Sequence, residues 1–73
     1  MNKQAFRAML AAHGDVYADV ARIIHTTTST VSDKVNEKNG IGFNQAEMTK
    51  LKEHYRLSAE QMDLIFFGNA VSK

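Results

Sequence analysis

The sequence contains no cysteine and no proline, only four glycines, and no long apolar run. The absence of cysteine excludes disulfides and thiolate metal sites, and it suits the reducing environment of the cytoplasm. The absence of proline, together with so few glycines, favours an all-α domain. No stretch approaches the roughly 18 apolar residues of a membrane span, and the N-terminus has no apolar segment of signal-peptide length. We therefore expect a cytoplasmic protein without a membrane partner.

The net charge is also small, because nine Lys and Arg against eight Asp and Glu give only +1 at pH 7. Many DNA-binding domains are plainly basic, so this value by itself is weak support for a nucleic-acid partner. The distribution is more informative. Lys3 and Arg7 lie in the expected first helix, Lys34 and Lys38 lie in or close to the expected third, and four of the eight acidic residues follow residue 46.

Two short helical patterns lie between Tyr17 and Asn36. Apolar residues recur at helical spacing over about residues 16–24, and again at Val31 and Val35. The segment between them, His25 to Thr27, leaves room only for a turn. In the second pattern only the two valines are expected to be buried. The other residues are Thr, Ser, Asp, Lys and Asn, so one face of this helix is polar and exposed. This layout is typical of a helix-turn-helix, in which the second helix reads the DNA major groove.

Cap and turn residues predict the other boundaries in a single domain, residues 1–73, with an ordered core of about 3–67. Gly14 should end a first helix that starts at residue 2 or 3, and Asp15 should cap the second. The remaining signals are local as well. Thr26 or Thr27 should cap a third helix that ends near Asn36, and a loop should follow over 37–42. Capping boxes at Asn44–Glu47 and Ser58–Gln61 should start two more helices, which run to about 55 and 67. Gly68 should stop the last helix, and a short C-terminal tail should follow over 69–73.

Five short helices in this order resemble the lambda-repressor-like domain of Cro/CI-type (XRE-like) phage repressors, over about residues 3–67. The strongest points are Ala21 in the second helix, the two turn threonines, and the core positions Val31 and Val35. The run VSDKVNEKNGIGFNQAEM and the terminal DLIFF block are also similar to small phage repressors. The resemblance implies a compact five-helix DNA-binding domain that acts as a Cro-like phage or prophage repressor in a bacterial host cell.

Two places depart from the family's usual residues. His25 stands where the family usually has glycine, because the backbone there is left-handed, a conformation that histidine tolerates better than a β-branched residue does. Leu10 and Val35 stand where many members bury an arginine against a glutamate. Replacing both charges is physically reasonable, since a well-packed apolar pair often matches or exceeds a buried ion pair. We expect Leu10 to pack against Val35.

Helical spacing and the resemblance together assign the site residues, and they imply double-stranded operator DNA as the partner. The base-reading residues are expected to be Thr28, Ser29, Ser32 and Asp33. The residues expected to contact the DNA backbone are Tyr17, Thr27, Asn36 and Lys38. A carboxylate such as Asp33 opposes phosphates, but it can accept a hydrogen bond from cytosine N4.

The last helix has an excess of apolar residues, because Leu64 to Phe67 are four consecutive ones and point all round its axis. One small helix cannot bury them all, so we expect a weak homodimer that uses Leu64 and Phe67. Such a dimer would bind a palindromic operator with half-sites about one helical turn apart.

Other interpretations stay open. One alternative is that the outer face of the third helix is only solvated. Another, favoured by the near-neutral charge, is a protein-interaction module on the same fold, such as an antirepressor or an antitoxin-like partner. Salt-dependent DNA binding would separate a DNA-binding regulator from this module, since phosphate contacts release counterions. His13, His25 and His54 have no ligand spacing, so no metal site or cofactor is expected. Nothing places Ser, His and Asp as a triad, so we expect neither an enzyme nor a small-molecule substrate.

Overall fold

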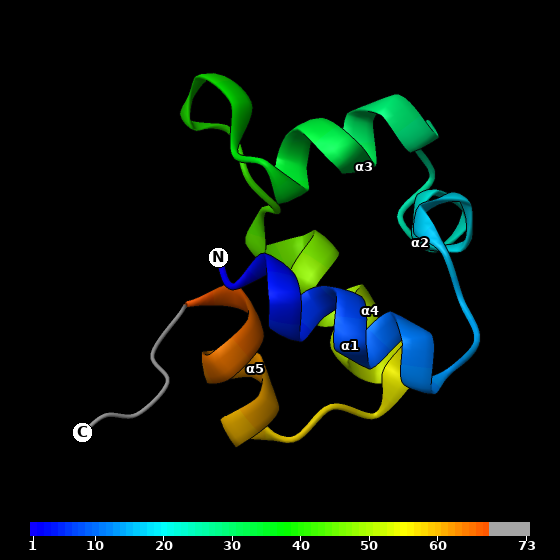
Figure 1. Cartoon of the computed structure of the whole chain (residues 1–73), viewed down its shortest axis with the longest axis vertical. Coiled ribbons are helices and arrows are strands. Elements are labelled where there is room, and N and C mark those ends of the chain that lie inside the picture. Colours follow the sequence, from blue (N-terminus) through cyan, green and yellow to red (C-terminus); the bar gives the residue numbers. More distant parts are fainter. Residues whose placement is uncertain (68–73) are drawn as a thin grey trace.

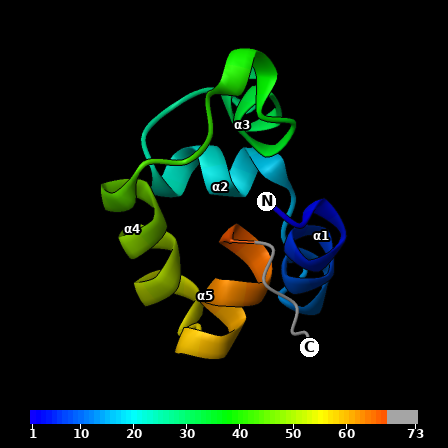
Figure 2. The same ribbon diagram turned by 90° about the vertical axis from the view of Figure 1, so that its left-hand side faces the viewer.

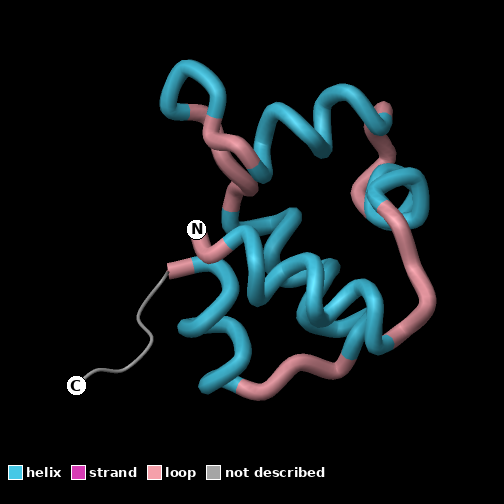
Figure 3. Tube along the Cα trace, in the orientation of Figure 1, coloured by secondary structure: helices cyan, strands magenta, loops and turns pink. Residues whose placement is uncertain are grey.

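The computed structural model describes residues 1–67, which form five α-helices and one short 3₁₀ helix and contain no strand (Figure 1). The all-α class predicted from the sequence is therefore confirmed. The helices are α1 (Lys3–Ala12), α2 (Tyr17–Ile23), α3 (Thr28–Val35), η1 (Lys38–Gly40), α4 (Gln45–Tyr55) and α5 (Ala59–Phe66). Short loops connect them, as the trace in Figure 3 shows. The expected stop at Gly68 and the tail over 69–73 lie outside the described residues.

The helices surround one apolar core. In Figure 2, α1 and α4 flank the core on two sides, α5 closes it below, α2 lies across the top, and α3 lies beyond α2 at the edge of the molecule. The ring of Phe6 is at the centre of an aromatic group, with ring centroids 6.1 Å from Tyr17, 5.7 Å from Phe43 and 6.2 Å from Phe66. The largest fully buried side chains come from the first four α-helices. They are Phe6, Val20, Val31, Val35 and Leu51.

Most helices begin at the residues that the sequence predicts, because the caps are local hydrogen bonds. Thr27 caps α3, with its Oγ1 accepting from the Thr30 amide at 3.2 Å. Asn44 caps α4 and exchanges hydrogen bonds with Glu47 in a capping box, at 2.8 and 3.0 Å. Ser58 and Gln61 form the second box at the start of α5. Each cap satisfies amides that have no partner inside the helix.

The expected role of Asp15 as the cap of α2 is wrong. Helix α2 begins one residue later than expected, after Val16, whose amide donates to Asp19 Oδ2 at 2.8 Å. The left-handed Gly14, with φ of 69°, turns the chain so that the Asp15 amide bonds back to the carbonyl of Leu10. Its carboxylate then accepts a hydrogen bond from the hydroxyl of Tyr55 in α4 at 2.6 Å. The residue that looked like a cap is a tertiary contact.

Candidate nucleic-acid interface

Helices α2 and α3 are joined by the four residues from Ile24 to Thr27. The amide of Ile24 donates to the Val20 carbonyl at 3.1 Å, and the amide of Thr26 donates to the Ala21 carbonyl at 2.8 Å. His25 between them is left-handed, with φ of 59°, as the sequence comparison with the family's glycine led us to expect. In Figure 1, α2 is seen end-on while α3 is seen from the side, so the two helices cross steeply. This turn fixes where α3 points.

Helix α3 is anchored on one side only. Val31 and Val35 are fully buried, while Ser29, Asp33 and Thr28 are exposed. Ser32 is half-buried, on the side of α3 that faces α1. Of the four residues predicted to read bases, three are therefore exposed and one is half-buried. The small polar residues give the surface of α3 both hydrogen-bond donors and acceptors.

The hydroxyl of Thr27 is engaged in the cap of α3. Besides accepting from the amide of Thr30, it donates to Oγ1 of Thr30 at 2.9 Å. The amides of the first turn of α3 lack partners inside the helix, as at any helix start. A phosphate at this end of the helix would therefore meet backbone amides, with Thr27 holding the start of the helix in place.

Helix α1 contributes a cation at the C-terminal end of α3. Lys3 Nζ donates to Oδ1 of Asn36 at 3.2 Å, and Nδ2 of Asn36 donates to Oγ of Ser32 at 3.5 Å. Asn36 and Lys3 are both exposed. The Asn36 amide is thus oriented between a lysine from α1 and a serine from α3.

A second cation of α1 lies near the other end of α3. Arg7 Nε donates to the Tyr17 hydroxyl at 3.3 Å, and this hydrogen bond raises the pKa of Arg7, which is cationic in any case. Arg7, Tyr17 and Thr28 line one groove of about 480 Å³ between α1 and the start of α2. Tyr17 is half-buried, with its ring beside Phe6 and its hydroxyl facing this groove edge.

The sequence did not identify Lys3 and Arg7 as site residues. Their spacing of four places them on the same side of α1, and that signal was available. What the sequence could not supply is the docking of α1, which brings Lys3 to Asn36 and Arg7 to the Tyr17–Thr28 groove. The two lysines and one arginine around α3 therefore come from separate elements, α1 and η1.

Lys34 is not part of the exposed cation group, although the sequence placed it near the reading helix. Its Nζ donates to Glu47 Oε1 at 2.9 Å, and its side chain is only 13% exposed. The same Oε1 accepts from the amide of Asn44, so the capping carboxylate of α4 also holds α3. This ion pair connects α3 to the start of α4.

Lys38 lies in η1, which follows α3 directly. Glu37 and Asn39 on either side of it are left-handed, with φ of 53° and 57°. The carboxylate of Glu37 is paired with the amino group of Met1 at 3.1 Å. Lys38 is exposed and lines a shallow cavity of about 270 Å³ together with Asp33. This predicted phosphate contact thus shares a cavity with Asp33.

No family model, curated protein or solved structure matches this chain. The arrangement of α1, α2, α3 and η1 is therefore the main evidence about function. Within residues 1–67 no helix combines the length and apolar character of a membrane span, and no group of three or more His, Asp and Glu side chains is placed to hold a metal ion.

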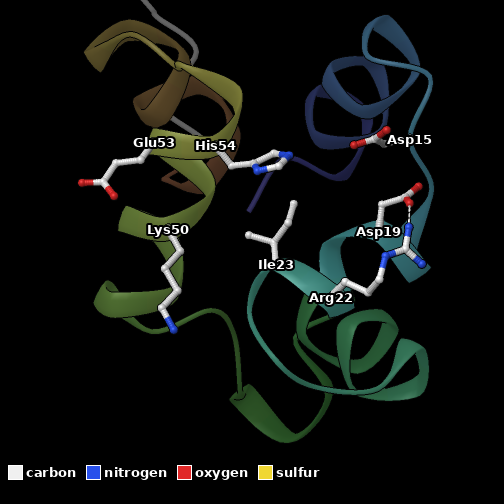
Figure 4. A pocket seen from close by; sticks show the side chains of 7 residues that line it. All are labelled: Asp15, Asp19, Arg22, Ile23, Lys50, Glu53 and His54. Carbon is white, nitrogen blue, oxygen red and sulfur yellow. Dashed lines mark hydrogen bonds and ion pairs between the residues drawn. The ribbon is translucent and has the colours of Figure 1, made fainter.

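A cleft with a volume of about 710 Å³ lies between α2 and α4 (Figure 4). Figure 4 shows Arg22 hydrogen-bonded to Asp19, while Lys50 and Glu53 point away from the centre of the cleft. Arg22 and Asp19 pair with each other, and the ring of His54 points into the cleft.

Leu64 and Phe67, the residues predicted to form a dimer contact, lie at the C-terminal end of α5. Phe67 is 56% exposed and Leu64 is 38% exposed, whereas their neighbours Ile65 and Phe66 are buried. Figure 1 places the end of α5 at the side of the molecule, near the start of α1, and the amide of Asn2 donates to the Ile65 carbonyl there.

Proposed function

We propose that the protein is a sequence-specific DNA-binding transcriptional regulator of the Cro-like repressor kind, from a phage or prophage. The observation that carries this proposal is the exposed polar surface of α3, which two buried valines hold in place and which cations of α1 border at both ends. A helix that presents small hydrogen-bonding side chains in this way suits the major groove, where each base pair has its own set of donors and acceptors.

In the proposed complex, α3 lies in the major groove and uses one surface to read bases. Thr28, Ser29, Ser32 and Asp33 face base edges. Contacts to the phosphates on either side set the register, and these come from Tyr17, Thr27, Asn36, Lys38 and, in addition, Lys3 and Arg7. The low net charge does not oppose this arrangement, because several acidic residues near the surface already have partners. Glu47 is paired with Lys34, Asp19 with Arg22, and Glu37 with the Met1 amino group.

The proposal includes a weak homodimer formed through the end of α5. Leu64 and Phe67 lie one helical turn apart on neighbouring faces of the helix, and both are exposed. Burial of this apolar surface in a dimer contact is favourable, because it removes the surface from water. A two-fold axis at this side of the molecule would set two copies of α3 about one DNA turn, roughly 34 Å, apart. The dimer would repress transcription by occupying the operator and excluding RNA polymerase.

The test of DNA binding is a selection from random duplexes, followed by titration of a selected site at several salt concentrations. We expect an enriched palindromic site and an affinity that falls linearly with salt on a log–log scale, because phosphate contacts release counterions. Ser29→Ala should change base preference at one position of each half-site, by about 1–3 kcal/mol where a good contact is lost. Thr49→Ala on α4 is the matched control and should change neither. The absence of any enriched site would refute the proposal.

The dimer is tested separately by sedimentation of the free protein and of its operator complex. Phe67→Lys should reduce the cooperativity of binding to a palindrome, while leaving binding to a single half-site unchanged. Glu60→Gln, on the same helix, serves as the control. Cooperativity that survives Phe67→Lys would remove α5 from the interface.

Two observations favour a second candidate, a protein-interaction module on the same fold. Val16 and Ile41 expose 63% and 58% of their surface, and the net charge is only +1. Apolar residues at the start of α2 and in the loop before α4 would suit a protein partner. The titration above distinguishes the two candidates, since a module of this kind would show no salt-dependent binding to duplex DNA.

A further inference from the structure

The reading surface of α3 contains no cation. Lys34 is the only basic residue between Thr28 and Val35, and its Nζ is held by Glu47 with little exposure. The commonest specific contact to DNA is a lysine or arginine that binds O6 and N7 of guanine. Helix α3 does not offer that contact, because its one lysine is committed to α4.

Asp33 is the outermost side chain of the same helix. It lies two residues from Val31 and two from Val35, and at about 100° per residue this places it opposite the buried side. It is exposed, and it has no ion-pair or hydrogen-bond partner among residues 1–67. Ser29 lies one turn before it on the same face and is also exposed. A charged group is thus centred on the surface that would enter the groove.

An ionised carboxylate only accepts hydrogen bonds, so it restricts what may lie opposite. In the major groove, guanine presents O6 and N7 and thymine presents O4, all of which are acceptors that repel it. Cytosine presents a single donor, the N4 amino group, whereas adenine sets its N6 donor beside the N7 acceptor. The group that suits Asp33 best is therefore cytosine N4.

From this arrangement we infer that Asp33 determines specificity by accepting a hydrogen bond from cytosine N4, in place of a cation that reads guanine; the inference rests on the proposed function. The carboxylate weakens attraction to every phosphate nearby, and Lys3, Arg7 and Lys38 at the edges of the surface offset that repulsion. The cations at the edges of this surface supply affinity for DNA, and Asp33 at its centre rejects the wrong bases. Specificity of this kind uses repulsion as well as attraction.

The test compares the wild-type protein with Asp33→Asn in site selection, followed by titration of duplexes that differ in one base pair. The wild type should prefer cytosine to thymine at one position of each half-site, by on the order of tenfold to a hundredfold. An asparagine amide both donates and accepts, and it pairs with N6 and N7 of adenine. Asp33→Asn should therefore change the preference from cytosine to adenine at that position alone, and should also bind non-specific duplexes more tightly.

Two further variants sharpen the result. Lys34→Met removes the inward cation and should leave every base preference unchanged among the molecules that circular dichroism shows to be folded. Ser29→Ala should affect a neighbouring position and leave the cytosine in place. The inference is overturned if Asp33→Asn raises affinity for all duplexes with no change in base preference, or if Lys34→Met abolishes a preference for guanine. A wild-type protein that binds no duplex in a salt-dependent way would instead refute the proposed function itself.

Discussion

The turn between α2 and α3 allows a direct test of backbone strain, through His25→Gly. His25 has φ of 59°, and its side chain is exposed. The conformation is held by hydrogen bonds of its neighbours, since the amides of Ile24 and Thr26 bond back to α2. Glycine adopts the same backbone angles with no Cβ to clash with the following carbonyl oxygen.

The expected gain is the difference between two effects of opposite sign. Relief of the left-handed conformation of an L-residue contributes about 1–2 kcal/mol. The larger conformational freedom of glycine in the unfolded chain destabilises the folded protein by about 0.4–1 kcal/mol. His25→Gly should therefore raise the free energy of unfolding by about 0.8 kcal/mol, within a range of about 0–1.6 kcal/mol. For a domain of this size the central value raises the melting temperature by about 3–6 °C.

Thermal unfolding followed by circular dichroism at pH 7 measures this gain. The control is His25→Ala, which removes the imidazole and keeps the Cβ, and which should bring no comparable increase. If the alanine and glycine variants melt at the same temperature, the Cβ is not the source of strain. A glycine variant that melts below the wild type would show that the imidazole stabilises the turn, and our reasoning about this residue would be wrong.

Two further predictions concern the core residue Leu10 and the hydrogen bond between Tyr55 of α4 and Asp15 in the turn before α2. Leu10 is buried, so Leu10→Ala should cost about 2–5 kcal/mol of stability; wild-type stability in thermal unfolding would contradict this. Burial and the hydrogen bond to Asp15 raise the pKa of Tyr55. The contribution of the Tyr55 hydroxyl to the free energy of unfolding is therefore complete below the usual tyrosine pKa of about 10, and it is lost as pH rises above that value. Tyr55→Phe should be about 1.5–3 kcal/mol less stable than the wild type at pH 7. Urea unfolding should show that this difference in stability becomes smaller above pH ~10. A difference that stays constant with pH would show that ionisation of Tyr55 does not affect stability.

The helices themselves follow from the sequence, because their signals act over three or four residues. Thr27, Asn44 and Ser58 cap the helices they were predicted to cap. The burial of Val31 and Val35 follows from their spacing alone, as does the exposure of Ser29 and Asp33. In each case the deciding contact lies within the helix or at its start, where a local hydrogen bond or a helical repeat leaves few alternatives.

Tertiary structure decided the contacts that join distant segments. Asp15 has the chemistry of a helix cap, yet its partner is Tyr55, 40 residues away. Lys34 was expected in or close to the third helix, and only the fold shows that the start of α4 offers a carboxylate that its flexible side chain reaches. The docking of α1 against α3 placed Lys3 beside Asn36. Such pairings depend on how whole helices pack around the core, and no residue pattern within one helix carries that information.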